Sequence, residues 1–311
     1  MIELFNKPNF NFIGRRRWAY ALSAAIMVLG LTTLAIKGLR YDIDFTGGNL
    51  VQVRFEQAPT VAAIRTGLAR IGLADSIIQE FGDPREFIIR VPLTAGASDE
   101  AARRIQAALA EETALGKSEI RRIEFVGPQV GRELQKQAIY AVLCGLVGIL
   151  LYIALRFDLK GGVAAIVAVF HDVVVCLGAI SLAGREFSLP VLAALLTIIG
   201  YSVNDTIVAY DRLRENRGKG APRGRNFAQL MNDAINQTLS RTVLTSLTTF
   251  LSTAILLVFG GKVLEDFAFV LFVGIITGTY STIYVAGALV VDWTLYVEGR
   301  LRRPKKAVAK A

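Results

Sequence analysis

The amino-acid sequence predicts an α-helical membrane protein with six transmembrane helices and one α+β domain outside the membrane. Of its 311 residues, 53% are hydrophobic, and the mean hydropathy is +0.46. The apolar residues gather in six runs, each long enough at about 1.5 Å per residue to cross a hydrocarbon core of about 30 Å. One long polar stretch separates the first run from the second. These observations exclude a soluble enzyme built around one large core.

The predicted spans are Trp18–Ile36, Ala138–Leu155, Gly161–Leu182, Leu189–Tyr210, Val243–Phe259 and Phe267–Val291. More than half of the 35 lysines and arginines precede span one, join spans two and three or four and five, or follow span six. The opposite short connections carry one each, Arg185 and Lys262. Because cytoplasmic connections carry the excess of basic residues, both termini are predicted to be cytoplasmic. The basic surface suits anionic membrane lipid, and nucleic acid is not an expected partner.

The domains follow from this layout. Residues 1–37 form the cytoplasmic N-terminus and first helix, 38–137 an extracytoplasmic domain, 138–292 helices two to six, and 293–311 a basic cytoplasmic tail. The outer domain has predicted strands at Asn49–Glu56, Ser76–Phe81, Glu86–Val91 and Glu119–Val126, with a helix after the first and third. The order βαββαβ is that of a ferredoxin-like fold. Since this domain contains neither histidine nor cysteine, we expect a binding or mechanical module rather than an enzyme.

Span four contains a polar pair, Asn204 and Asp205, in the stretch GYSVNDT. A carboxylate at membrane depth is costly and indicates a functional site, although a structural hydrogen bond between helices is the alternative. Arg241 begins span five at the same cytoplasmic end, where it either meets Asp205 or anchors the helix at the interface.

Span three contains His171 and Asp172, which either relay protons or pack neighbouring helices through hydrogen bonds. Adjacent residues point about 100° apart on a helix and need not act together. The hydroxyl-rich span five and Gly274-x-x-x-Gly278 in span six favour close packing. A single histidine excludes a multi-histidine metal site, and the chain lacks a phosphate-binding G-x-x-x-x-G-K-[ST] loop, so we expect no metal, cofactor or ATPase activity.

The stretch DFTGG at the entry to the outer domain, with Asp44, Phe45, Gly47 and Gly48, resembles the D-F-x-G-G motif of the SecD and SecF family of protein-export subunits. The stretch VGPQVGREL, with Gly127, Pro128 and Gly131, resembles the segment before the second span of SecF. The stretch GYSVNDTIVAYDRLREN, with Gly200, Asp211 and Arg212, is similar to its fourth span, and INQTLSRTVLT is similar to the start of its fifth.

The resemblance implies a subunit of the bacterial inner membrane that pairs with SecD in a unit similar to the RND transporters. It implies contact with the SecYEG channel, with YajC as a further candidate partner, and with unfolded polypeptide drawn across the membrane by the proton motive force. It also implies that Asp205 carries the proton with Arg241 as its partner, with Asn204, His171 and Asp172 nearby. The alternatives are an RND-type exporter of small molecules or lipids, which the chain length disfavours, and a purely structural subunit.

Overall fold

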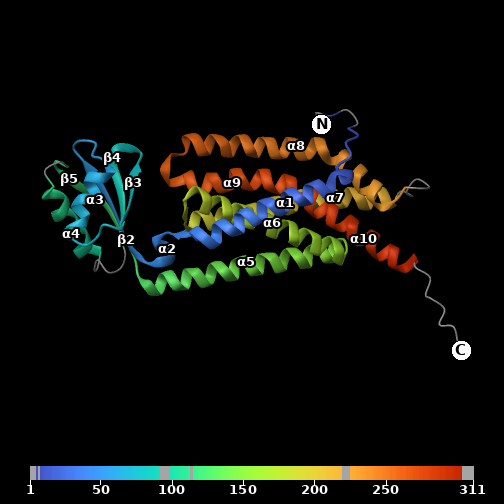
Figure 1. Cartoon of the computed structure of the whole chain (residues 1–311), viewed down its shortest axis with the longest axis horizontal. Coiled ribbons are helices and arrows are strands. Elements are labelled where there is room, and N and C mark those ends of the chain that lie inside the picture. Colours follow the sequence, from blue (N-terminus) through green and yellow to red (C-terminus); the bar gives the residue numbers. More distant parts are fainter. Residues whose placement is uncertain (1–4, 6–7, 92–97, 113–114, 219–224, 303–311) are drawn as a thin grey trace.

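The computed structural model describes residues 5, 8–91, 98–112, 115–218 and 225–302. It consists of a bundle of long helices with a small α+β domain at one end (Figure 1). The elements of the bundle are η1 (Ile13–Arg15), α1 (Arg16–Lys37), α5 (Pro128–Arg156), α6 (Leu159–Ala183), α7 (Leu189–Gly218), α8 (Phe227–Phe259), α9 (Gly261–Ser281), the π-helical turn η3 (Thr282–Ala286) and α10 (Gly287–Arg302). Part of the predicted basic tail, residues 303–311, lies outside the described residues.

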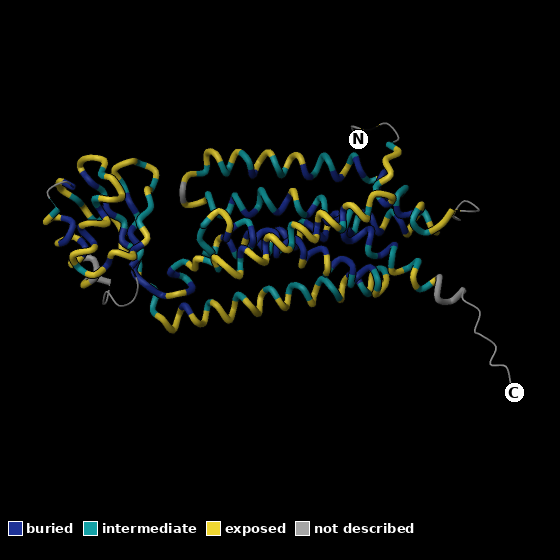
Figure 2. The backbone as a smooth tube through the Cα atoms, viewed as in Figure 1, coloured by how far each residue is buried: buried dark blue, intermediate teal, exposed yellow. Residues whose placement is uncertain are grey.

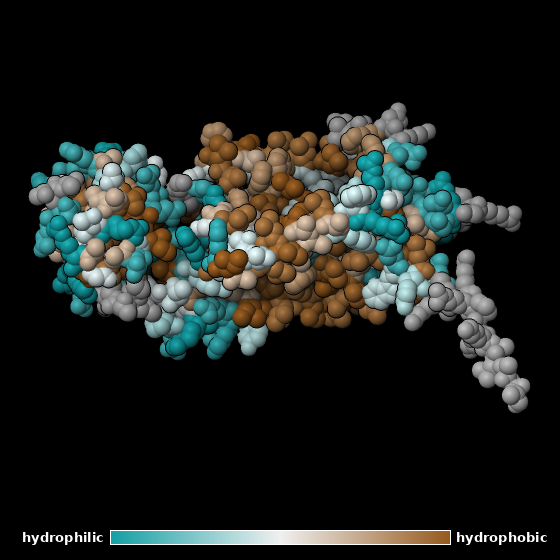
Figure 3. All heavy atoms as spheres, viewed as in Figure 1, coloured by the Kyte–Doolittle hydropathy of each residue, from teal (hydrophilic) through white to brown (hydrophobic). Residues whose placement is uncertain are grey.

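Among the described residues, six helical segments are long and apolar enough to cross a membrane, which agrees with the six predicted spans. The sixth is continuous through α9, η3 and α10. On the face shown in Figure 3, apolar side chains form a band across the middle of the bundle, with polar side chains towards both ends. Several helices extend beyond the predicted spans. For example, α8 begins at Phe227 because Asn226 and Gln229 form a reciprocal capping box.

The outer domain has the predicted ferredoxin-like topology. Its elements are β2 (Gly48–Phe55), α3 (Val61–Ala69), β3 (Ile77–Phe81), β4 (Asp83–Val91), α4 (Ser98–Ala110) and β5 (Ser118–Val126). The strand order is β3-β4-β2-β5, and every neighbouring pair is antiparallel. Alternate residues of the strands, such as Val51, Phe87 and Ile89, pack with Ile64 and Leu109 of α3 and α4 in one core.

The outer domain is joined to the bundle by a short junction. Here β1 (Arg40–Tyr41) pairs in parallel with β6 (Glu186–Phe187), which lies between α6 and α7. The one-turn helix α2 (Ile43–Thr46) follows, with the side chain of Asp42 accepting a hydrogen bond from the backbone N–H of Ile43. Figure 1 places this junction between the sheet and the ends of the long helices. Segments far apart in the sequence therefore meet where the two parts of the molecule touch.

The helices differ in how much neighbouring helices cover them. In the most apolar stretch of each helix, 61% of the residues of α6 are buried, compared with 6% in α5 and 11% in α8. Figure 2 shows α6 at the centre of the bundle and α5 and α8 along two of its edges. The exposed apolar faces of these outer helices must therefore meet lipid or a second protein.

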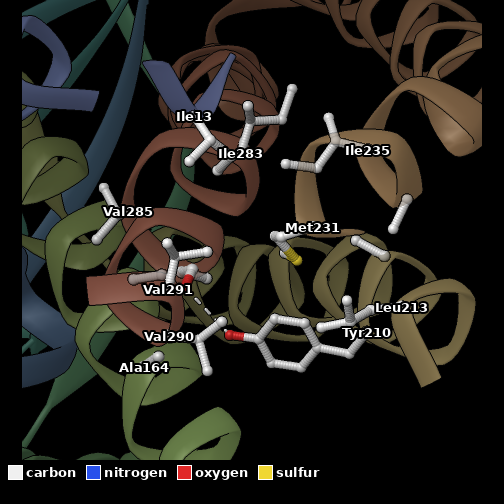
Figure 4. Packing of buried hydrophobic residues seen from close by; sticks show 14 of the residues in the cluster. Ile13, Ala164, Tyr210, Leu213, Met231, Ile235, Ile283, Val285, Val290 and Val291 are labelled. Atoms are coloured by element: carbon white, nitrogen blue, oxygen red, sulfur yellow. Dashed lines mark hydrogen bonds between the residues drawn. The ribbon is translucent and has the colours of Figure 1, made fainter. Parts of the chain in front are cut away.

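Small residues permit close helix contacts, as predicted for span six. A side chain on Gly274 would lie 2.5 Å from Ile198 of α7, and α1 crosses α6 so closely that a Cβ on Gly178 would lie 2.5 Å from the Cα of Gly30. At the end away from the outer domain, Tyr210 of α7 donates a hydrogen bond to the carbonyl of Ala286 within a cluster of aliphatic side chains (Figure 4).

Candidate functional site

A buried polar cluster joins α6, α7 and α9 inside the bundle. Asp172 of α6 is 1% exposed. Its Oδ2 accepts hydrogen bonds from the hydroxyls of Ser202 of α7 and Ser281 of α9, both at 2.7 Å. The two hydroxyls lie 3.5 Å apart. One carboxyl oxygen of Asp172 thus links three helices through two hydrogen bonds of ordinary O–H···O length.

His171 belongs to the same cluster. Its Nδ1 lies 3.1 Å from Oδ1 of Asp172, so the two neighbouring side chains interact, which their directions on an ideal helix did not require. Its Nε2 is buried and has no hydrogen-bond partner within the described chain. The imidazole lies beside the ring of Tyr280, whose hydroxyl donates to the carbonyl of Ala19 and accepts a hydrogen bond from Ser23. The polar contacts therefore reach α1.

The π-helical turn η3 begins directly after Ser281. Thr282, its first residue, contacts the hydroxyl of Thr206 at 3.1 Å and donates to the carbonyl of Ser202 at 3.3 Å. A π-helical turn inserts one extra residue into a helix and often marks a functional site. In this chain it brings successive hydroxyls of α9 and η3 against α7.

Asp205 lies one turn beyond Ser202 on α7 and is buried, with 4% exposure. Its Oδ2 has no hydrogen-bond partner among the described residues. The hydroxyl of Tyr201, one turn earlier on α7, is also buried and also has no hydrogen-bond partner among the described residues. A buried polar atom without a partner costs free energy unless water or another chain supplies one.

The expected contact between Asp205 and Arg241 is not formed as an ion pair. Arg241 is exposed on α8, and within the part of the chain that the structure describes no salt bridge or hydrogen bond joins the two side chains. They remain close enough for an electrostatic interaction. Asn204 is exposed on another face of α7 and does not join the buried cluster. Sequence neighbours on one helix are therefore divided between its interior and its surface.

The hydroxyls of α8 act mainly within their own helix. The residues whose hydroxyls donate to carbonyls three or four positions earlier are Thr245, Thr248, Thr249, Ser252 and Thr253. Ser246 is the member that reaches across, to Thr279 of α9 at 2.8 Å. This pattern agrees with a packing role, because such bonds satisfy the hydroxyl without crossing to another helix.

The D-F-x-G-G motif forms the junction with the outer domain. Asp44 accepts a hydrogen bond at 3.3 Å from the backbone N–H of Leu189, the first residue of α7, and burial raises the pKa of its carboxyl. Phe45 is 2% exposed and packs against the ring of Phe187. Gly47 has φ 72°, and a side chain on Gly48 would lie 2.7 Å from the carbonyl oxygen of Val91. Both positions therefore require glycine.

The remaining motif residues have structural contacts. Gly127 is the residue before α5 and Pro128 its first residue, where proline suits a helix. A side chain on Gly131 would lie 2.9 Å from the carbonyl oxygen of Phe45, so α5 packs directly on the D-F-x-G-G motif. The other motif residues lie on the surface or in open space, with Asp211 paired to Arg156, Arg212 bonded to Gln237 and Glu215, and Gly200 exposed.

Sequence reasoning missed Ser202, Ser281, Thr206 and Thr282. Ser202 could have been found, since it precedes Asp205 by three residues and so shares its helix face. Nothing in the sequence around Ser281 or Thr282 distinguishes these two hydroxyls from the many others in the spans. They became partners of Asp172 and α7 only through the packing of α9.

Comparisons with known proteins agree with the fold and the motifs. The family model of the C-terminal region of the SecD/SecF protein export membrane proteins matches residues 105–295, and that of the SecD/SecF GG motif matches 33–59. The protein translocase subunit SecF of Desulfurispirillum indicum is 48% identical over 302 residues, or 94% of each chain. SecF of Pseudomonas aeruginosa is 39% identical over 281 residues, or 90% of each chain.

Among solved structures, the crystal structure of the translocon-associated membrane protein SecDF from Thermus thermophilus superposes with a TM-score of 0.82 at 46% identity. The alignment covers 93% of this chain and 39% of SecDF, so the chain spans about two fifths of that protein's length. A second SecDF structure, in a super-membrane-facing form, gives a TM-score of 0.73. The chain therefore belongs to the SecD/SecF family of protein export membrane proteins, as a SecF-type subunit.

Proposed function

We propose that this chain is the SecF-type subunit of a bacterial protein translocase. Together with SecD it uses the proton motive force to promote the passage of secreted polypeptides across the inner membrane. Family membership supports this role, and the buried acidic cluster of α6 and α7 supports the proton coupling. The sequence has no phosphate-binding loop, so the energy comes from the gradient rather than from ATP hydrolysis by this chain.

Asp205 is the proposed proton carrier, and the observation that carries this assignment is its buried, unpartnered oxygen. A carboxylate removed from water favours its neutral form until a cation or a hydrogen-bond donor approaches. Arg241 is the available cation, and its long side chain can turn inward from the surface of α8. Movement of α8 against α7 would then alternate between a paired, charged state and an unpaired, neutral state of the carboxyl.

Asp172 and His171 form the second proposed station. Ser202, which bonds to Asp172, lies about 4.5 Å from Asp205 along the axis of α7, at about 1.5 Å per residue. The hydroxyls of Ser202 and Thr206 can pass a proton because a hydroxyl both donates and accepts. One proton that crosses a potential of 100 mV releases about 2.3 kcal/mol, which is enough to bias a two-state rearrangement of the helices.

SecD is the proposed partner within the membrane. The stripe of α7 that the bundle leaves uncovered consists of small and polar residues: Ala193, Thr197, Gly200 and Asn204. Such a stripe suits a second helix better than lipid. In SecDF, a region similar to this chain is part of one longer polypeptide. We propose that a separate SecD subunit takes the place of the rest of that polypeptide. SecYEG, YajC and the emerging polypeptide are proposed contacts outside this pair, with the outer domain facing the polypeptide.

The proposed orientation has both termini in the cytoplasm. The described residues before α1 and the end of α10 lie at the end of the bundle opposite the outer domain (Figure 1). The basic connections lie at that same end, which supports its assignment to the cytoplasm. The outer domain, with residues 38–137, then lies in the extracytoplasmic space.

The test is a vesicle translocation assay with and without an imposed proton gradient. Asp205→Asn should assemble with SecD and retain the ATP-driven step, yet lose the stimulation by the gradient, because an amide of the same size cannot carry the proton. Arg241→Met should lose the stimulation as well, since the carboxylate then has no cation. Asp233→Asn is the matched control, because Asp233 is paired with Arg225 at the start of α8, outside the cluster. Full gradient response of the Asp205 variant would refute the assignment.

A further inference from the structure

One arginine of the outer domain forms ion pairs with the segment that joins α1 to this domain and with the connection between α6 and α7. Arg90 of β4 contacts Asp42, which precedes α2, through Nε at 3.0 Å from Oδ1. Its Nη1 forms a second ion pair with Glu186 of β6. The three side chains are between 12% and 14% exposed. Such burial leaves these pairs less screened by salt than pairs on the surface.

The alternation of β4 directs Arg90 away from the core of the domain. Ile89 and Val91 are buried beneath α3 and α4, so the side chain between them lies on the opposite face of the sheet. That face borders a cleft of about 250 Å³ between the sheet and the ends of the long helices. Charged side chains line this cleft, among them Asp42, Arg90, Arg122, Glu124 and Glu186. Replacement of Arg90 therefore leaves the hydrophobic core intact.

Glu186 lies between the two helices that carry the buried acidic cluster. It follows α6, which holds Asp172, and precedes α7, which holds Asp205. The neighbouring Arg185 is fixed to Glu265 and Asp266 at the start of α9, so β6 is also bound to that helix. A displacement of α6 or α7 consequently moves Glu186, and its ion pair with Arg90 gives that movement a direct route to the sheet.

The ion pair between Arg90 and Glu186 is more stable when the two side chains are either in full contact or fully separated than at an intermediate distance. Burial raises the pKa of the Glu186 carboxyl, and the charge of Arg90 opposes this effect. A half-broken pair would leave a desolvated charge without a counterion, which is costly. The bridge thus resists small separations of the domain from the bundle, and it gives way only when both charges regain water.

We propose that Arg90 is a positioning residue that transmits movement of α6 and α7 to the outer domain by clamping Asp42 and Glu186. The proposal rests on the proposed function, since it is the step that follows proton transfer. It predicts that loss of Arg90 loosens the contact of the outer domain with the connection between α6 and α7 while each part remains folded.

The experiment compares Arg90→Met with Arg122→Met in the full-length chain. Arg122 lines the same cleft, but its ion pair is with Glu124 of the same strand. Arg122→Met therefore removes an equal charge and leaves the ion pairs of Arg90 in place. Spin labels at the exposed positions Ala62 of α3 and Lys136 of α5, in a cysteine-free background, report the distance between domain and bundle. We expect one narrow distance distribution for the parent and for Arg122→Met, and a broadened one for Arg90→Met.

Gradient-stimulated translocation is the second readout, and Arg90→Met should lower it about fivefold or more. A factor of about five is the lower end of the coupling usually found between distant sites. Arg90→Lys keeps the charge and should recover part of both signals. If Arg90→Met fails to accumulate, Glu186→Gln tests the same bridge from the membrane side. An unchanged distance distribution, or equal effects of Arg90→Met and Arg122→Met, would overturn the proposal. Because the distances need no proton transfer, they decide the role of Arg90 even if Asp205→Asn refutes the proposed function.

Discussion

Replacement of Asp172 by alanine should destabilise the bundle far more than replacement by asparagine. Asp172 accepts two hydroxyl bonds at 2.7 Å, and hydrogen bonds to charged groups contribute about 1.5–3 kcal/mol each. Ser281 can recover part of this loss, because its hydroxyl also lies 3.2 Å from the carbonyl oxygen of Gly278. We therefore expect Asp172→Ala to lower the free energy of unfolding by about 3–5 kcal/mol.

Asp172→Asn retains one acceptor oxygen toward Ser202 and Ser281. It exchanges two charge-assisted bonds for neutral ones, which contribute about 0.5–1.5 kcal/mol each, and it removes a desolvated charge. The expected loss is about 1–2 kcal/mol, well short of that for alanine. Ser202→Ala removes one of the two bonds and should fall between the two Asp172 variants.

The assay is reversible unfolding of the purified protein in mixed detergent, combined with the gradient-dependent translocation assay. If Asp172 is a proton station, Asp172→Asn remains folded but loses the gradient response. If it only binds helices together, the same variant keeps that response. Equal stability of Asp172→Ala and the parent would refute the energetic reasoning. A full gradient response of a folded Asp172→Asn would show that the proton path avoids this residue.

Three further predictions follow from the layout and the packing. A cysteine at the exposed position Ala62 should react with an impermeant thiol reagent from the outside of intact cells, and reaction only after lysis would reverse the proposed orientation. Residues 40–132 expressed alone should fold without metal or cofactor, and a circular-dichroism spectrum typical of an unfolded chain would contradict this. Gly178→Ala should destabilise the protein by about 1–3 kcal/mol through overpacking against α1, whereas Gly145→Ala, which has nothing within 4 Å, should not, as measured by unfolding in detergent.

The outer domain was predictable because its pattern is local. Alternation in β2 and the cap of α3, in which the side chain of Thr60 accepts a hydrogen bond from the N–H of Ala63, each depend on a few neighbouring residues. The ferredoxin-like strand order then follows from the order of the elements. The role of Arg90 was not predictable, because its partners Asp42 and Glu186 lie far away in the sequence and meet it only across the junction.

The sequence by itself determined the six spans, since hydropathy over a helix length measures a property of the chain rather than of its packing. It also identified Asp205, His171 and Asp172 as exceptional, because a titratable group in an apolar run is costly in any arrangement of the helices.

Only the tertiary structure decided which of these polar groups act together. It joined His171 to Asp172, supplied Ser202 and Ser281 as donors, and left Asp205 without the ion pair expected with Arg241. The physical reason is that a hydrogen bond depends on a fraction of an ångström and on direction. Those quantities arise from how the faces of α6, α7 and α9 pack, and no single helix encodes them.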